Sequence, residues 1–420
     1  MLMPAYAMPA PAPANAQFQH WRDEIIRTLY VPQHLPLAPR SYGAFSPMPG
    51  VIAERVTYGT EFGMRVPAIV YRPAAGHGRL PAMVVVNGHG GDKYSWYAFY
   101  TGMLYARAGA VVLTYDTIGE GERNPDRKSG TRLHDRPVNA PHYAQRLSGL
   151  MIGDVMQAVS YLRQRPDVDP SRVAVLGYSL GSFVAVLAGA ADPRIDVLVL
   201  SGGGDLDGPG GYWEERTNKP MCEGIPWKSL SAYGDEAAIV YALNQRRGPT
   251  LIMNGDSDTV VDIPHDHEQP FFDDLARRVE ALTGTKRNIF QTYWVIGASH
   301  RPSWLTRPAA LWLENKLHFP NWTAQKIEAM PLTHISSWAE KYHVAMDKGY
   351  SSEQREGGVM ALGDDIPGIP RDELNALPRS EWEAQKDAFV YGAWVRHALA
   401  AEGITGAAAE KAIAAGQKAR

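Results

Sequence analysis

The sequence has very little cysteine, since Cys222 is the only one among 420 residues. A single thiol excludes an intrachain disulfide framework and a zinc site built from cysteines. Cys222 is a candidate nucleophile in principle, but the segment 219–224 around it reads as a loop, with no strand leading into it. We therefore interpret it as an incidental thiol.

Long apolar runs and an excess of one charge are also lacking. No stretch approaches the ~18–20 apolar residues that span a bilayer, so we expect no membrane span. The 42 Lys and Arg residues and the 45 Asp and Glu residues give a formal net charge of -3. No dense basic block occurs, which argues against a nucleic-acid partner. The expected ligand is a small molecule or a neutral polymer.

Residues 1–17 are rich in Ala and Pro and carry no charged side chain. They contain Ala14-Asn15-Ala16, which resembles a signal-peptidase site, but a positive n-region and a continuous apolar h-region are both missing. The stub of a longer leader and a disordered tail both fit this composition. The compartment, cytoplasmic or secreted/periplasmic, therefore stays open.

Strands and helices alternate from about residue 51 to residue 317. Continuous β-branched runs suit strands that are buried on both faces of a parallel sheet, and they lie at 82–87, 110–115, 172–176, 196–200, 250–253 and 291–295. Helical stretches are expected at 96–108, 145–163, 183–190, 271–282 and 302–316. Segments 51–58 and 65–72 are typical of an opening antiparallel pair. The pattern predicts an α/β fold with a mostly parallel central sheet flanked by helices.

Three stretches interrupt this alternation. Residues 119–141 form a polar, Arg-rich connection, and residues 202–233, rich in Gly and Trp, predict a cap-like insertion. Residues 321–420 predict a C-terminal helical extension in which we identify no chemistry. Two roles are open for it: covering the active site, or pairing with a second copy in a homo-oligomer. The remaining divisions are a lead-in segment at 1–50 and a catalytic domain at 51–320.

The strongest motif is Gly177-Tyr178-Ser179-Leu180-Gly181, placed between a predicted strand and a predicted helix. Gly-x-Ser-x-Gly at such a turn lifts the serine hydroxyl clear of the sheet, and only small residues fit two positions before and after it. The N-terminus of the following helix favours developing negative charge. An ordinary glycine-rich turn is the alternative. The context favours Ser179 as the nucleophile of an α/β-hydrolase.

A serine nucleophile needs a base and an orienting acid, which follow it in the order Ser, Asp, His in this fold. His300 follows the last predicted strand in a Gly-x-x-His loop and is the expected base. Asp258 fits the pattern Gly-x-x-Asp-x-Val-Val and is favoured as the acid, and Asp256 would then be a turn residue. The less favoured acids are Asp262 and Asp205.

The oxyanion hole needs two N–H donors. We expect one from Leu180 and the other from Gly90 or Gly91, in a loop whose His-Gly-Gly resembles a lipase motif without its last glycine. A flexible turn is the alternative. A metal role for His89 is not favoured because no second ligand stands at a suitable spacing, and we expect neither metal nor cofactor. Residues expected to shape the substrate pocket, if they do not simply pack, are His89, Trp96, Tyr97, Tyr178, Trp213 and Trp227.

The segment Asp116-Thr117-Ile118-Gly119-Glu120-Gly121-Glu122-Arg123 is similar to the Asp-Pro-Ile-Gly-Gln-Gly-Glu-Arg segment of acetyl-xylan-esterase-like α/β-hydrolases, which are related to dienelactone hydrolases. Residues 165–172, before the serine turn, resemble the same family. The resemblance covers about residues 50–320 and implies hydrolysis of carboxylic esters by Ser179 and His300. The chain departs from the family pattern at Thr117, Glu120 and the serine turn, so acetylated sugar as substrate is an analogy.

The sequence thus predicts a serine carboxylesterase that cleaves acetyl or other short-acyl esters, including carbohydrate esters. A serine peptidase of the same fold is one alternative, although the lead-in segment is too short for the large propeller that such peptidases usually carry. A non-catalytic binding protein is the other alternative, although such proteins usually lose part of the triad.

Overall fold

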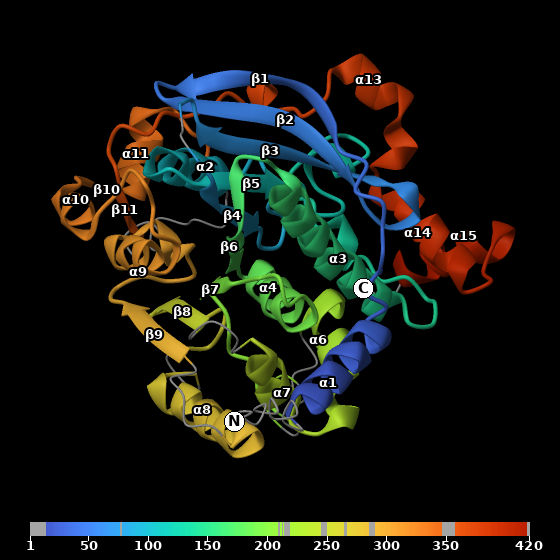
Figure 1. The fold of residues 1–420 in the computed structure, drawn as a ribbon. Helices are drawn as coiled ribbons and strands as arrows, with labels where there is room; N and C mark the ends of the chain where they lie inside the picture. The colour runs from blue at the N-terminus through green and yellow to red at the C-terminus, as the bar shows by residue number, and fades with distance from the viewer. Residues whose placement is uncertain are drawn as a thin grey trace, which may run out of the picture.

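The computed structural model describes residues 14–417 apart from 76–77, 209–210, 212, 214–218, 245–249, 264–266, 285–289 and 347–357. Within these ranges a nine-stranded sheet lies at the centre, and helices cover both of its faces (Figure 1). In the described part of the chain, no helix combines the length and the apolar character that crossing a bilayer requires.

The strand order of the sheet is β1-β2-β3-β5-β4-β6-β7-β8-β9. The strands are β1 (Arg40–Met48), β2 (Val51–Gly59), β3 (Arg65–Pro73), β4 (Leu80–Val86), β5 (Val111–Tyr115), β6 (Val168–Tyr178), β7 (Val197–Ser201), β8 (Thr250–Gly255) and β9 (Phe290–Val295). Pairing is antiparallel from β1 to β5 and parallel from β5 to β9. The expected α/β-hydrolase fold, with its opening antiparallel pair, is confirmed.

Two hydrophobic cores lie on opposite faces of the sheet. Alternate residues of β4 divide between them, because side chains of a strand point to opposite faces: Val84 packs into one core and Val85 into the other. The first core also includes side chains from the helices α3 (Tyr143–Gln164), α4 (Leu180–Ala191), α7 (Glu236–Leu243) and α8 (Gln269–Thr283). The second core includes side chains from α2 (Trp96–Ala108) and α9 (Arg307–Leu317).

The lead-in segment contains regular structure that the sequence pattern did not indicate. Helix α1 (Ala14–Thr28) packs against α4, and β1 forms the edge of the sheet. Most residues of β1 are exposed or half-buried. An edge strand of this kind lacks the continuous apolar run that marks the central strands, which explains why it was missed.

The connection and the cap carry short helical elements. Residues 119–141 contain the 3-10 turns Gly121–Arg123 and Leu133–Asp135. The described part of the cap contains helix α6 (Met221–Lys228) and a further turn. Cys222 therefore lies in a helix, and the expectation of a loop around it was wrong.

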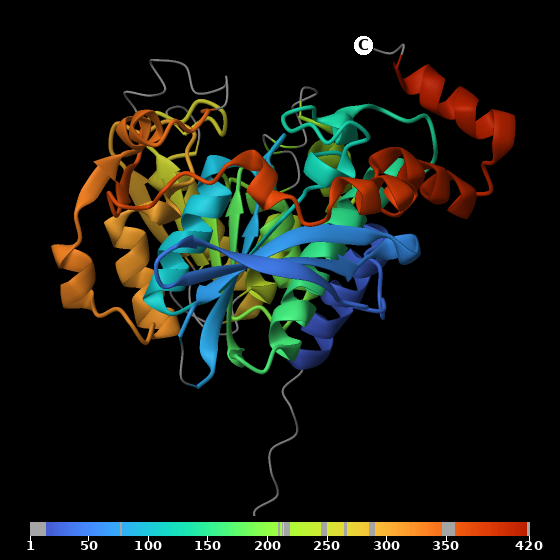
Figure 2. The same cartoon turned by 90° about the horizontal axis from the view of Figure 1, so that it is seen from above.

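The C-terminal extension is not only helical. Its elements are α10 (Ala324–Ala329), β10 (Leu332–His334), α11 (Ile335–Lys341), β11 (Met360–Leu362), α13 (Arg379–Ala384), α14 (Tyr391–Ala401) and α15 (Gly406–Gln417). Strands β10 and β11 form a small antiparallel sheet. The extension crosses the molecule from one side of the large sheet to the other (Figure 2). Trp338 accordingly packs in the second core, whereas Trp382 packs in the first.

Candidate active site

Ser179 occupies a strained turn between β6 and α4. Its φ of 55° and ψ of -123° lie in a region that residues with a side chain rarely adopt. A Cβ on Gly177 would lie 2.2 Å from the carbonyl oxygen of Gly181, and a Cβ on Gly181 would lie 2.2 Å from that of Val86. Glycine is therefore required on both sides of the serine, which accounts for the Gly-x-Ser-x-Gly pattern.

His300 and Asp258 come from the loops after β9 and β8 and form a hydrogen-bonded pair. The Nδ1 atom of His300 lies 2.8 Å from Oδ2 of Asp258, a fully buried carboxylate. The other oxygen of Asp258 accepts the N–H of Val260 at 2.9 Å. Asp256, in contrast, is exposed and accepts the N–H of Gly297 at 2.8 Å, as a turn residue does. A buried carboxylate bonded to Nδ1 of the histidine is the geometry expected of a triad acid, and Asp258 has it whereas Asp256 does not.

The two less favoured acids have other surroundings. Asp205 follows β7 and its Oδ2 lies 3.7 Å from Nδ1 of His267 and 4.0 Å from Nζ of Lys219. Asp262 lies in the same loop as Asp258, with a left-handed φ of 57°. Neither arrangement orients the His300 ring.

A cavity of about 1300 Å³ opens above the carboxyl ends of the central strands, and both Ser179 and His300 line it. The two candidate oxyanion glycines and five of the six predicted pocket residues also line it, namely Gly90, Gly91, His89, Trp96, Tyr97, Tyr178 and Trp213, whereas Trp227 does not. The structure thus brings residues from five separate segments to one cavity. This is the arrangement expected of parallel strands, whose carboxyl ends lie at one edge of the sheet.

The aromatic residues predicted to shape the pocket are mostly buried. Tyr178 packs its ring 5.1 Å from that of His300 and donates its hydroxyl hydrogen to the His300 carbonyl oxygen at 3.1 Å. Trp213 stacks on Phe183 with ring centroids 5.5 Å apart, and Trp96 is 4% exposed. Packing therefore accounts for much of their role, and Tyr178 in particular restrains His300.

The two candidate oxyanion glycines differ in their backbone bonds. The N–H of Gly91 donates to the carbonyl oxygen of Gly88 at 2.9 Å and closes a turn. Gly90 has a left-handed φ of 74°, and its own carbonyl oxygen accepts the N–H of Gly130 at 3.0 Å. Because the Gly91 hydrogen is engaged inside the turn, Gly90 is the better partner for Leu180, the first residue of α4.

One wall of the cavity comes from the C-terminal extension, which sequence reasoning missed. The lining residues from this segment are Tyr342, His343, Val344, Ala345, Met346, Gly368, Ile369, Pro370, Arg371 and Leu374. Residues 321–420 carry no motif, so no local signal could have placed them there. The extension therefore forms part of the wall of the cavity that Ser179 and His300 line.

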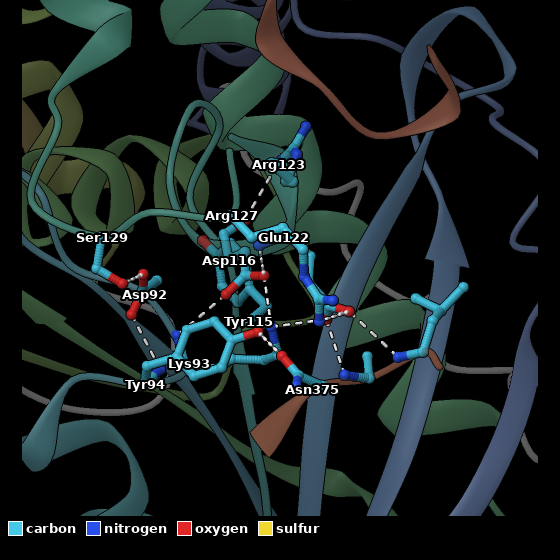
Figure 3. Close-up of polar contacts among 12 residues, drawn as sticks. Asp92, Lys93, Tyr94, Tyr115, Asp116, Glu122, Arg123, Arg127, Ser129 and Asn375 are labelled. Carbon is cyan, nitrogen blue, oxygen red and sulfur yellow. Dashed lines mark hydrogen bonds and ion pairs between the residues drawn. The ribbon is translucent and has the colours of Figure 1, made fainter. Parts of the chain in front are cut away.

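A buried ionic network fastens the extension beside the cavity (Figure 3). The Nζ atom of Lys93 lies 2.5 Å from Asp116 and 2.9 Å from Glu122, and all three side chains are fully buried. Burial disfavours the charged ammonium, but the two carboxylates outweigh it and raise the pKa of Lys93. Glu122 also accepts the N–H groups of Ala376 at 2.8 Å and of Leu377 at 3.2 Å.

A second polar cluster combines buried and half-buried side chains and includes His89 from the loop after β4. His89, His134, Asp135 and Cys222 each direct one ligand atom into a space where all four atoms lie within 4.8 Å of one another. Burial lowers the pKa of His134 to about 4. The expectation that His89 lacks a second ligand was therefore wrong. The partners come from the 119–141 connection and the cap, so spacing along the sequence could not reveal them.

Comparisons with known proteins agree with this geometry. The sequence profile of the acetyl xylan esterase (AXE1) family matches residues 11–201, and that of the prolyl oligopeptidase family matches residues 143–326. The chain thus has the α/β-hydrolase fold and is similar to acetyl xylan esterases over residues 11–201. The two profiles overlap on the helix before the serine turn and on the turn itself, and the second continues through Asp258 and His300.

Two curated relatives of this hydrolase match over shorter stretches. The thiohydrolase apmlB of Arthrinium phaeospermum is 27% identical over 155 residues, which is 35% of this chain and 42% of the relative. The hydrolase ORFZ of Pyricularia oryzae is 29% identical over 160 residues, which is 37% of this chain and 33% of the relative. The chain therefore spans less than half of the length of these relatives.

Solved structures share the fold at low identity. A protein provisionally assigned as an acetyl xylan esterase from Bacteroides fragilis has a TM-score of 0.51 and 15% identity, covering 67% of this chain and 75% of that one. The methylesterase BT1017 has a TM-score of 0.53 and 18% identity, covering 87% and 70%. A glucuronoyl esterase from Solibacter usitatus has a TM-score of 0.51 and 17% identity, covering 77% and 98%. At these identities the likeness shows the fold alone.

Proposed function

We propose that this hydrolase is a serine carboxylesterase with Ser179 as its nucleophile. One observation carries the proposal: the 2.8 Å hydrogen bond between His300 and the buried Asp258, at a cavity that Ser179 also lines. A carboxylate on Nδ1 keeps the hydrogen on that nitrogen and leaves Nε2 of His300 as the base. The strained turn presents the serine at the N-terminus of α4.

The reaction follows from these positions. His300 removes the proton of Ser179 as the serine oxygen attacks an ester carbonyl, and Asp258 stabilises the imidazolium. The N–H groups of Leu180 and Gly90 stabilise the oxyanion. His300 then protonates the departing alcohol, and water repeats the cycle on the acyl-enzyme.

The cavity supports a substrate with a bulky alcohol. Its volume of about 1300 Å³ exceeds the roughly 300–1,000 Å³ of common small-molecule sites. The acetyl xylan esterase profile favours a sugar as the alcohol, and the structural neighbours named as a methylesterase and a glucuronoyl esterase support an ester as the substrate. We therefore propose short-acyl esters of carbohydrates as the substrate class.

The test compares hydrolysis of p-nitrophenyl acetate and butyrate by the wild type, Ser179→Ala and Ser41→Ala. Ser41 lies exposed on the edge strand β1 and serves as the control. We expect loss of turnover in Ser179→Ala alone, and phenylmethanesulfonyl fluoride label on Ser179 by mass spectrometry. Full activity in Ser179→Ala would reject the nucleophile, and a wild type without turnover or label would favour a binding protein.

A serine peptidase is a second candidate, because the prolyl oligopeptidase profile covers residues 143–326 and so includes Ser179, Asp258 and His300. The two functions differ in the leaving group. We expect kcat/KM for p-nitrophenyl esters and acetylated xylo-oligosaccharides to exceed that for aminoacyl p-nitroanilides and peptides. The reverse order would replace the esterase by the peptidase.

A further inference from the structure

Four potential metal ligands converge beside the cavity, from segments far apart in the sequence. His89 belongs to the loop after β4, His134 and Asp135 to the 3-10 turn Leu133–Asp135, and Cys222 to α6. Each contributes one ligand atom to a group whose members all lie within 4.8 Å of one another. Two imidazoles, a carboxylate and a thiol form a mixed set of nitrogen, oxygen and sulfur donors.

The distances within the cluster fit the edges of a tetrahedron. Oδ1 of Asp135 lies 3.4 Å from Nε2 of His89 and 3.4 Å from Nε2 of His134. The Sγ atom of Cys222 lies 3.6 Å from that oxygen and 3.3 Å from Nε2 of His89. Ligands about 2.0–2.3 Å from a zinc ion at tetrahedral angles are separated by about 3.3–3.6 Å. These four separations suit one central ion, and the other two, from His134 to His89 and to Cys222, are within 4.8 Å.

His134 gives an independent reason for a cation at this position. Its Nδ1 lies 3.0 Å from the carbonyl oxygen of Ile118, which can only accept, so Nδ1 carries the hydrogen. Its Nε2 then presents a lone pair. This atom is fully buried and has no hydrogen-bond partner among the described residues, and it faces the carboxylate of Asp135. A buried acceptor of this kind is costly unless a cation binds it.

Outer hydrogen bonds hold the ligands in place. The Nε atom of Arg132 donates to Oδ2 of Asp135 at 2.5 Å and leaves Oδ1 directed into the cluster. The Ile118 carbonyl fixes the ring of His134 in the same way. Bonds of this type orient the ligands of metal sites and set the imidazole tautomer.

We propose that His89, His134, Asp135 and Cys222 bind one zinc ion. Nitrogen and thiolate ligands select zinc over magnesium or calcium, which prefer oxygen. On binding, the thiol of Cys222 gives its proton to solvent, and the thiolate and the carboxylate together balance the charge of the ion.

Four protein ligands complete the tetrahedron, so the ion holds structure and does not activate water. His89 precedes Gly90, the proposed oxyanion donor, while Cys222 belongs to the cap. The ion therefore fastens the oxyanion loop to the cap and to the 119–141 connection. It acts on catalysis only through the position of that loop.

The test measures metal binding directly, and its readout does not depend on turnover. Full-length wild type, Cys222→Ala, His134→Ala and His343→Ala are stripped with a chelator, incubated with zinc chloride, desalted and analysed by mass spectrometry of the metal. His343 is an exposed imidazole on the wall of the same cavity and serves as the control. We expect about one zinc ion per chain in the wild type and the control, and less than about 0.2 in the other variants.

Two further readouts distinguish a lost ligand from a lost fold. Cobalt in place of zinc should give a thiolate charge-transfer band in the wild type that is absent in Cys222→Ala. Zinc should raise the Tm of the wild type by several degrees but leave that of the folded variants unchanged. Wild type that retains no zinc after desalting, or equal zinc in all four proteins, would overturn the proposal.

Discussion

Two polar clusters include residues of the loop after β4, one around Lys93 and one around His89. The first contains its own cation, since the ammonium of Lys93 lies between the carboxylates of Asp116 and Glu122. The second joins two imidazoles, a carboxylate and a thiol, none of which is a permanent cation. The two clusters thus differ in the cation that would stabilise their acceptor groups. In the first cluster it is the ammonium of a lysine, and in the second it is the proposed zinc ion, which comes from solution.

The largest effect is expected when the ammonium of Lys93 is removed from the first cluster. Lys93→Met should destabilise the protein by about 3–5 kcal/mol, because it removes the ammonium between two buried carboxylates and leaves Glu122 only the guanidinium of Arg127 at 3.2 Å. Urea unfolding measures the change. Arg379→Met, which removes an exposed partner of Glu383, is the control and should cost less than about 1 kcal/mol. Equal losses in both variants would contradict the role assigned to Lys93.

The same carboxylate-to-amide change should have unequal effects in the two clusters. Glu122→Gln should cost about 1–3 kcal/mol, because both oxygens of Glu122 accept hydrogen bonds, from Lys93, Ala376 and Leu377, and either amide orientation sets an NH₂ against a donor. Asp135→Asn should cost less than about 1 kcal/mol in the zinc-free protein, because the amide N–H can donate to Nε2 of His134 and so offsets the loss of the hydrogen bond that Oδ1 accepts from Cys222.

Thermal melts with and without zinc measure this difference. Zinc should raise the Tm of Glu122→Gln as it raises that of the wild type, and it should leave the Tm of Asp135→Asn unchanged. If zinc-free Asp135→Asn were destabilised as much as Glu122→Gln is, a proton or a cationic side chain of the protein would already neutralise the second cluster. This result would contradict the role proposed for zinc.

The last comparison uses Glu61, a carboxylate whose direct partner is a neutral donor, the Nε1–H of Trp394 at 2.9 Å. Burial raises the pKa of Glu61 to about 7. The folded state therefore favours the protonated acid, and the stability from this group is present at low pH and lost as the pH rises towards 7 and above.

Glu61→Gln keeps an acceptor for Trp394 but does not titrate. It should match the wild type near pH 5 and exceed its stability by about 1–2 kcal/mol at pH 8, discounted because the side chain is partly exposed. Urea unfolding at the two pH values is the measurement. A constant difference between the variant and the wild type would contradict the raised pKa.

The sequence predicted the central sheet because its strands are buried on both faces and read as continuous apolar runs, as in β4. It did not indicate β1, whose residues are mostly exposed and contain no continuous apolar run. The segments that carry Ser179, Asp258 and His300 were found because each directly follows a strand, a local signal. Their catalytic roles stay predictions.

The clusters could not be predicted in this way. The ligands of the second cluster come from a loop, a connection and a cap, and the cavity wall at Tyr342 and Arg371 comes from a segment without a motif. Only tertiary packing brings such residues together. The segment from Asp116 to Arg123, noted for its family resemblance, holds two members of the first cluster, so buried ion pairing is one reason for that pattern.

The C-terminal extension contributes much of the cavity wall but none of the proposed catalytic groups. Its attachment points, such as Ala376 and Trp382, lie apart from the residues that line the cavity. A large part of the cavity wall and the proposed catalytic groups thus come from separate stretches of the chain. Substitutions in the lining stretches of the extension could therefore change the proposed alcohol site without altering the proposed catalytic groups, so substrate preference and reaction could vary independently.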